Sequence, residues 1–156
     1  MLKNTAGIHQ FMPDKVWKWR LLEQKVDQVL SLHDYQEIRL SVLQDYHVIH
    51  EGITALMQES EANQATESIV NLSQPNGDIS LLTLRPEGTI SVLHHTASIM
   101  QDNEIYRFFY LGPMFRKVKG AHPMVFHQLG VELLGSSSVL SENEVISIGM
   151  KICQKL

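Results

Sequence analysis

Several features that mark common protein classes are absent from this 156-residue chain. It has one cysteine, Cys153, so neither an internal disulfide framework nor a cysteine-based zinc site can form. It has no run of eighteen apolar residues, and its first ten residues lack the apolar stretch of a signal peptide. Basic residues number 13 against 17 acidic ones, and a net charge of -4 provides no overall positive field for nucleic acid. We expect a soluble cytoplasmic protein without membrane contact, with residues 1–156 forming a single domain.

The common signature motifs are absent as well. The chain contains no GxGxxG, no GxxxxGK[ST] and no HExxH, which excludes the usual dinucleotide, phosphate-loop and metalloprotease motifs. Eight histidines are present, but His94 and His95 are adjacent and therefore point to different faces of a helix. No metal site is predicted.

The apolar residues, 44% of the chain, follow helical and strand spacing in turn. Asp14 is an expected N-cap, and Asn76-Gly77 is typical of a hairpin turn. Residues 59–68 are polar and without periodicity, which predicts a mobile loop. The pattern predicts an α+β fold around an antiparallel sheet. Helices are expected over residues 13–34, 45–57, 89–100 and 141–156, and strands over 35–40, 69–72, 79–84, 105–115 and 124–134.

Net positive charge occurs late in the chain, because residues 105–156 carry six basic and three acidic residues. Arg85 is the one basic residue between positions 46 and 104, whereas Arg116, Lys117 and Lys119 fall within four positions. A guanidinium at a strand end binds phosphate or carboxylate oxygens well, so this cluster is the candidate anion site. The alternative is a solvated turn whose charges only keep it soluble.

A second candidate segment is the run LRPEGT at residues 84–89. Proline and glycine shape a strand-to-helix junction there, from which Glu87 and Thr89 would project toward a ligand. Glu87 could equally cap the following helix, because a carboxylate is favoured at the positive end of the helix dipole. Both interpretations remain open.

The third candidate segment lies on the strand predicted over residues 124–134. Gln128 and Glu132 share one face of it, and Gly130 leaves space between them. An amide and a carboxylate on either side of such a gap could seat a ligand ammonium group. A solvated strand face is the alternative.

These segments together resemble the histidyl-tRNA synthetase family of class II aminoacyl-tRNA synthetases over essentially the whole chain. The resemblance lies in LRPEGT (84–89), YLGPMFR (110–116), FHQLGVELLG (126–135) and, for motif 1, YQEIR (35–39). The resemblance implies the class II fold, an antiparallel sheet flanked by helices, in a protein that is usually a dimer. It also implies the family's reaction, in which histidine is activated with ATP and Mg²⁺ and then transferred to tRNA. It also implies that Arg116 acts in catalysis by holding the ATP α-phosphate and the histidine carboxylate. The implied contacts of the histidine amino group are Glu87, Thr89, Gln128 and Glu132.

The chain departs from the family pattern at identifiable places. Leu40-Ser41 stands where motif 1 has a proline, and Val118 stands where motif 2 has an acidic residue. Nothing resembles the segment that reads the imidazole, motif 3 or the anticodon-binding domain. We therefore expect a partial catalytic core, carrying motifs 1 and 2, that does not complete aminoacylation alone.

Two further expectations follow from a partial core. A sheet with an uncovered edge demands pairing, which predicts a homodimer or docking onto another chain. tRNA is a further candidate partner, and the sequence leaves open whether it contacts Lys117 and Lys119. The alternatives are a non-catalytic histidine-sensing module, like the synthetase-like regulatory subunit of ATP phosphoribosyltransferase, and a pure interaction protein.

Overall fold

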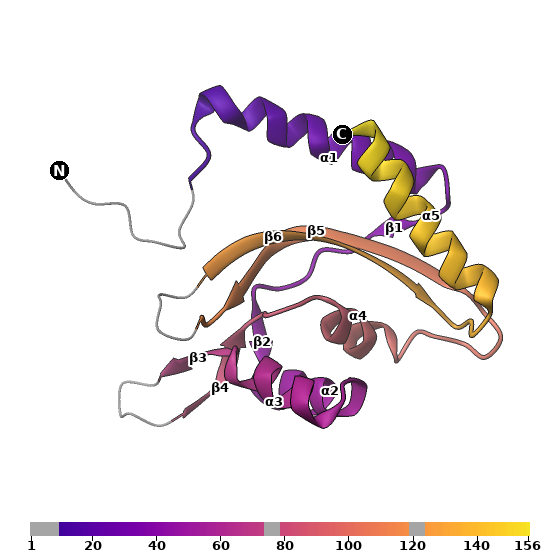
Figure 1. The fold of residues 1–156 in the computed structure, drawn as a ribbon. Coiled ribbons are helices and arrows are strands. Elements are labelled where there is room, and N and C mark those ends of the chain that lie inside the picture. Colours follow the sequence, from indigo (N-terminus) through magenta and orange to yellow (C-terminus); the bar gives the residue numbers. More distant parts are fainter. Residues whose placement is uncertain (1–9, 74–78, 119–123) are drawn as a thin grey trace. The chain divides into compact units, whose positions relative to one another are not determined.

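The computed structural model describes residues 10–73, 79–118 and 124–156. Backbone contacts divide the chain into two compact units (Figure 1). The described part of unit 1 comprises residues 40–73, 79–98, 112–118 and 124–128, and unit 2 comprises residues 10–39, 99–111 and 129–156. The prediction of a single domain stays a prediction, since two compact units can belong to one folding domain.

The described helices and strands confirm the predicted α+β class. The helices are α1 (Pro13–Ser31), α2 (Tyr46–Leu56), α3 (Glu59–Glu67), α4 (Thr89–Thr96) and α5 (Val139–Lys155). The strands are β1 (Gln36–Glu37), β2 (Leu43–Asp45), β3 (Val70–Ser73), β4 (Ile79–Leu84), β5 (Tyr106–Arg116) and β6 (Met124–Leu134).

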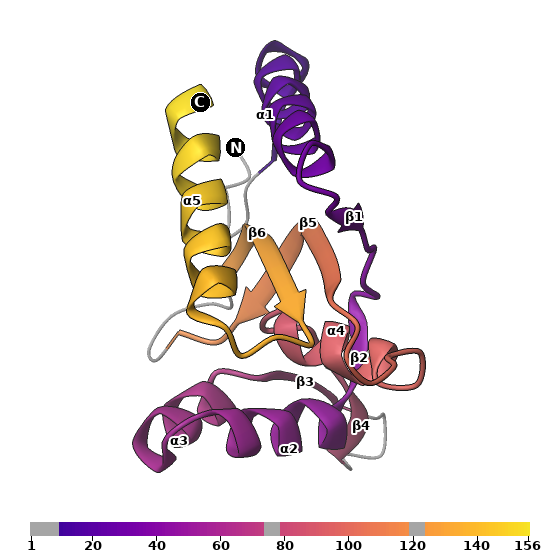
Figure 2. The same ribbon diagram turned by 90° about the vertical axis from the view of Figure 1, so that its right-hand side faces the viewer.

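The core of unit 2 lies between its two long helices and its strands. Helices α1 and α5 pack on each other and run side by side in both views (Figures 1 and 2). Their apolar faces, represented by Leu30 and Ile148, enclose Tyr35 and Phe109. Helix α1 begins at Pro13 with Met12 as N-cap, so the prediction that Asp14 is the N-cap is wrong. Proline suits the first helical position because its φ is already helical and it lacks an N–H.

Strands β5 and β6 share a three-stranded sheet with β1, in the order β1-β5-β6. The segment predicted as a strand over residues 35–40 is regular only at Gln36 and Glu37. It pairs parallel to β5, with Gln36 opposite Phe108, which is a departure from the expected purely antiparallel sheet.

Residues 141–144 (SENE) have the spacing of a capping box, which predicts Ser141 as the N-cap of the last helix. Helix α5 begins at Val139, two residues before that box. Ser138 is the N-cap, and its hydroxyl accepts a hydrogen bond from the Leu140 N–H at 3.2 Å. The predicted cap Ser141 instead bonds the Ser136 hydroxyl at 2.7 Å. The prediction of a box over residues 141–144 is therefore wrong, because an earlier serine meets the same need.

Unit 1 contains an antiparallel sheet in the order β2-β4-β3 and the helices α2, α3 and α4. The predicted hairpin of β3 and β4 is confirmed, while its turn at residues 74–78 lies outside the described residues. Asp45 caps α2 through the backbone N–H groups of His47 and Val48. Ile49, Ile53 and Ile90 form the centre of the core.

The prediction of a loop over residues 59–68 is wrong, because Glu59–Glu67 forms α3. Ala62 packs into the core. Glu59 and Glu61 lie in the first turn, where their negative charge interacts favourably with the positive end of the helix dipole. Tertiary packing thus supports a helix whose own sequence has little apolar character.

Helix α4 is shorter than predicted, ending at Thr96 rather than near Met100. Its buried side comprises Ile90, Ser91, Val92 and Thr96. Helical spacing predicts Ala97 on the same face as Ile90, but Ala97 is exposed.

Candidate functional site

The turn after β4 is held in place by a buried arginine, Arg85, for which the sequence predicts no role. Arg85 is 4% exposed and donates from Nε to the carbonyl of Pro113 at 2.8 Å and from Nη1 to the carbonyl of Leu40. The Phe115 N–H donates to the Arg85 carbonyl at 3.0 Å. A methyl group at Gly112 would lie 2.5 Å from Arg85 Nη2, so this glycine leaves room for the guanidinium. The chain just before Pro86 is thereby fixed to β5.

Glu87 caps helix α4 from the position before its N-cap. The Ile90 N–H lies 3.1 Å from Glu87 Oε1 and 3.3 Å from Oε2. The capping interpretation of this residue is therefore confirmed. It does not exclude ligand binding, because a carboxylate has about four acceptor positions.

Arg116, the last residue of β5, reaches back to the same turn. Its Nε donates to the carbonyl of Pro86 at 2.9 Å, and its guanidinium carbon lies 4.9 Å from the centre of the Phe126 ring. The hydrogen bond and the cation–π contact together fix the orientation of a long side chain that would otherwise be flexible.

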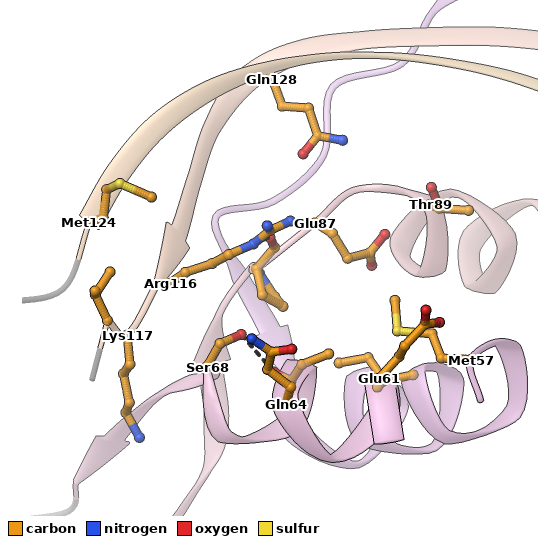
Figure 3. Close-up of a pocket in the computed structure, with 14 residues that line it drawn as sticks. Met57, Glu61, Gln64, Ser68, Glu87, Thr89, Arg116, Lys117, Met124 and Gln128 are labelled. Carbon is orange, nitrogen blue, oxygen red and sulfur yellow. Dashed lines mark hydrogen bonds between the residues drawn. The ribbon is translucent and has the colours of Figure 1, made fainter. Parts of the chain in front are cut away.

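These groups open into one cavity of about 490 Å³, and all of its lining residues belong to unit 1. Figure 3 shows Gln128 pointing into it from β6, opposite the helices. The lining residues are Ile53, Met57, Glu61, Gln64, Ala65, Ser68, Pro86, Glu87, Thr89, Arg116, Lys117, Val118, Met124 and Gln128.

Charges of opposite sign occupy different walls of this cavity. Arg116 extends from β5 toward the Pro86 turn, whereas the carboxylates of Glu87 and Glu61 lie toward the first turn of α4 (Figure 3). The ammonium group of Lys117 points away from the cavity (Figure 3). The arrangement suits a small molecule that carries both an anionic and a cationic group.

The cavity brings together four of the five predicted site residues: Glu87, Thr89, Arg116 and Gln128. Glu132 belongs to unit 2, and its place in the site stays a prediction. Lys119, part of the predicted basic cluster, lies outside the described residues.

The space expected beside Gly130 is not open. A Cβ atom there would lie 2.0 Å from Tyr110 Cζ, so the ring of Tyr110 occupies it. Gly130 therefore makes room for a buried aromatic ring, and the predicted gap for a ligand ammonium group is wrong at this position.

The cavity wall that α3 contributes, with Glu61 and Gln64, is not predicted from the sequence. A usable signal was present, since Ala62 and Ala65 recur at helical spacing between polar residues. Two alanines form only a weak apolar stripe, and the polar composition of residues 59–68 favours a loop more strongly than the alanines favour a helix.

Among the described residues, no three His, Cys, Asp or Glu side chains gather as metal ligands would. Nor does any helix in that part of the chain combine the length and apolarity needed to span a bilayer.

Solved structures define the class of protein. The chain superposes on apo histidyl-tRNA synthetase from S. aureus with a TM-score of 0.72 and 25% identity, covering 99% of this chain and 34% of that one. A structure described as an ATP phosphoribosyltransferase regulatory subunit/histidyl-tRNA synthetase from Bacillus halodurans C gives 0.77 at 21% identity, covering 99% and 38%. The fold is that of part of a class II aminoacyl-tRNA synthetase-like core, as predicted.

Sequence comparison narrows the class to one family. The family profile described as histidyl-tRNA synthetase matches residues 7–156. The histidine–tRNA ligase of Staphylococcus carnosus is 31% identical over 160 residues, and that of Prochlorococcus marinus AS9601 is 34% identical over 158 residues. The chain belongs to the histidyl-tRNA synthetase family, and it covers 36% and 35% of the length of these two relatives.

Proposed function

We propose that this chain is a histidyl-tRNA synthetase-like protein whose unit 1 cavity binds histidine and ATP. The observation that carries the proposal is that Glu87, Thr89, Arg116 and Gln128 line one cavity. A carboxylate, an amide and a hydroxyl suit the α-ammonium group of an amino acid, and a guanidinium suits its carboxylate or a phosphate. Glu132 is proposed as a further contact of the ammonium group.

The proposed chemistry is adenylate formation. A carboxylate oxygen of histidine attacks the α-phosphorus of ATP, the bond to the bridging oxygen breaks, and pyrophosphate leaves with its electron pair. Arg116 would neutralise charge on the α-phosphate and hold the two reactants in line. Its bond to Pro86 keeps the guanidinium oriented before they arrive.

ATP would bring Mg²⁺, which takes oxygen ligands and usually keeps phosphate oxygens and water among them. The carboxylates of Glu61 and Glu87 are donors of the right kind, so the cavity fits the ion. When bound, the ion supplies charge neutralisation at the phosphates. Val118 offers no oxygen where the family has an acidic side chain, and we expect ATP affinity to suffer for that reason.

Complete aminoacylation in the family uses motif 3 and an anticodon-binding domain, and this sequence contains no segment that resembles either. It spans about a third of the length of its curated relatives, so transfer to tRNA is proposed only with those parts supplied. tRNA contact through Lys117, a homodimer and a cytoplasmic location belong to the same proposal. Support for the homodimer comes from Leu43 and Leu82, which are 45% and 43% exposed in the unit 1 sheet.

The alternative function is a histidine sensor without catalysis. The Bacillus halodurans structure favours it, because its description names a regulatory subunit beside the synthetase. The two functions differ in the need for ATP.

Thermal unfolding with histidine, ATP or both tests the proposal, because a ligand that binds the folded state raises the melting temperature. The synthetase function predicts a larger shift with both ligands, together with histidine-dependent pyrophosphate exchange. A shift with histidine alone and no exchange supports the sensor. No shift at millimolar ligand excludes both.

Single-residue variants test whether histidine binds in this cavity. Glu87→Gln and Glu132→Ala should each abolish the histidine shift, whereas Glu142→Ala on α5 should leave it unchanged. A full shift in Glu132→Ala would remove that residue from the site while leaving the cavity assignment intact.

A further inference from the structure

Unit 2 has a cavity of its own, for which the proposed function has no use. It measures about 210 Å³ and lies where the end of α1 meets the last turns of α5, two helices that run side by side (Figures 1 and 2). Three of its six lining residues carry or can acquire a positive charge, and none of the six is acidic. The lining residues are Val29, Leu32, His33, Lys151, Gln154 and Lys155.

The cationic side chains reach this cavity from both helices. Lys151 and Lys155 are one turn apart on α5, and the ammonium group of Lys151 lies 3.1 Å from Nε2 of His33, which follows α1. A lysine ammonium group has donors and no acceptor, and a charged imidazole has donors only as well. An oxyanion between them would accept from both groups.

No carboxylate of the described chain neutralises these lysines. Neither Lys151 nor Lys155 makes an ion pair with a described acidic side chain. The acidic residue whose charge interacts with His33 is Glu144, and it is already bonded to Arg107 at 2.8 Å. The positive charge at the cavity is therefore left for a ligand from solution.

The helix dipole explains only part of this charge. Lys155 lies in the last turn of α5, where a cation is favoured at the negative end of the dipole. The effect is confined to the last turn, so it accounts for neither Lys151 nor His33. The carbonyl of Lys155 already accepts a hydrogen bond from the ammonium group of Lys25.

We propose that this cavity binds a phosphate group. A carboxylate brings one negative charge, whereas a phosphate brings about two near pH 7 and offers more acceptor oxygens, which suits several donors that converge from two elements. Lys151, Lys155 and His33 supply the positive charge, and the amide of Gln154 supplies a neutral donor. The site goes beyond the proposed function and does not depend on it, because the histidine and ATP cavity belongs to unit 1.

Nuclear magnetic resonance of the full chain labelled with ¹⁵N tests the proposal, because it locates the bound anion. Both lysines are exposed, so we expect a dissociation constant for inorganic phosphate on the order of 1 mM. Phosphate should shift the amide signals of residues 29–33 and 151–155, and sodium chloride at the same ionic strength should not. AMP distinguishes the sources: an equal effect on these signals identifies a phosphate ester, and no effect identifies the free ion.

Variants test the contribution of the individual lysines. Lys151→Gln should weaken phosphate binding about fivefold, and the double variant with Lys155→Gln should weaken it more than about tenfold. Lys15→Gln is the matched control, because this exposed lysine of α1 carries the same charge and does not line the cavity. It should keep the dissociation constant of the parent chain. Circular dichroism checks that α1 and α5 survive each change.

The outcomes separate this site from the one in unit 1. Shifts confined to residues around Arg116 would leave the proposed function intact and overturn the inference. Equal shifts with chloride, or equal weakening by Lys151→Gln and Lys15→Gln, would show a response to ionic strength or net charge and would overturn it as well. Shifts at residues 29–33 and 151–155 that depend on Lys151 support it, even if histidine and ATP do not bind.

Discussion

At the scale of single residues, the site depends on side chains that the ligand would never touch. Arg85 joins the turn before Glu87 to β5 through the carbonyl of Pro113, and it also reaches the carbonyl of Leu40. A buried guanidinium bonded to carbonyl oxygens cannot be removed cheaply, because those oxygens then lose their partners. The position of Glu87 therefore depends on a residue one step outside the cavity.

Replacing Arg85 by methionine should lower the free energy of unfolding by about 2–4 kcal/mol, because hydrogen bonds from a charged donor are worth more than neutral ones. Urea unfolding followed by circular dichroism measures the loss. Arg39→Met is the control, since the side chain of Arg39 is 86% exposed and should change stability by less than about 0.5 kcal/mol. Equal losses in the two variants would contradict the role given to Arg85.

At the scale of elements, the sequence predicts what is strongly periodic or locally encoded. Helix α1, strands β5 and β6 and the β3–β4 hairpin follow from apolar spacing and turn residues. Helix α3 does not, because its stability comes from packing Ala62 against the core of unit 1. The same holds for the site. Its four predicted residues lie in recognisable sequence motifs, whereas Glu61 lies on α3 and is not predicted.

The start of α5 shows why local signals compete. Ser138 and Ser141 are both acceptable caps, and the sequence alone favours Ser141 because Glu144 follows at capping-box spacing. In the structure, Glu144 bonds Arg107 at 2.8 Å and accepts from the Tyr35 hydroxyl at 3.1 Å. Glu144 therefore bonds residues that are distant in sequence instead of capping the helix, and no local sequence pattern predicts these partners.

The same glutamate gives unit 2 a pH-dependent stability. The hydrogen bond from Arg107 lowers the pKa of Glu144 from its usual value, and burial raises the pKa of Tyr35 to about 12. A depressed folded-state pKa contributes stability that is present above the unfolded value and lost as pH falls through the folded value. Glu144 thus stabilises the fold at neutral pH and ceases to do so in acid.

Glu144→Gln should therefore cost about 1 kcal/mol of unfolding free energy at pH 7 and much less at pH 3. Urea midpoints at the two pH values measure the difference. Glu142→Gln, in the first turn of the same helix, is the control for the loss of a carboxylate near the helix dipole. A cost in Glu144→Gln that is the same at both pH values would contradict the ion pair as its cause.

At the scale of the whole molecule, the described residues form two separate core clusters rather than one. The cluster around Ile53 in unit 1 and the cluster around Leu30 in unit 2 share no residue. Strands β5 and β6 run through both units, with their pairing residues divided at positions 111–112 and 128–129. Regions with separate cores can open separately, each with its own free energy.

Ligand binding should reveal this division, because the cavity is lined by unit 1 alone. A ligand slows exchange in the region whose opening destroys its site, by a factor of about ten when its concentration is about ten times Kd. With saturating histidine, we expect backbone amides of α3 and the first turn of α4 to exchange about tenfold more slowly, and those of α1 and α5 to stay unchanged. Hydrogen–deuterium exchange with mass spectrometry resolves these segments, and leucine at the same concentration is the control. Equal slowing in all four helices would show that the two units open only together, which would overturn the independence that their separate cores predict.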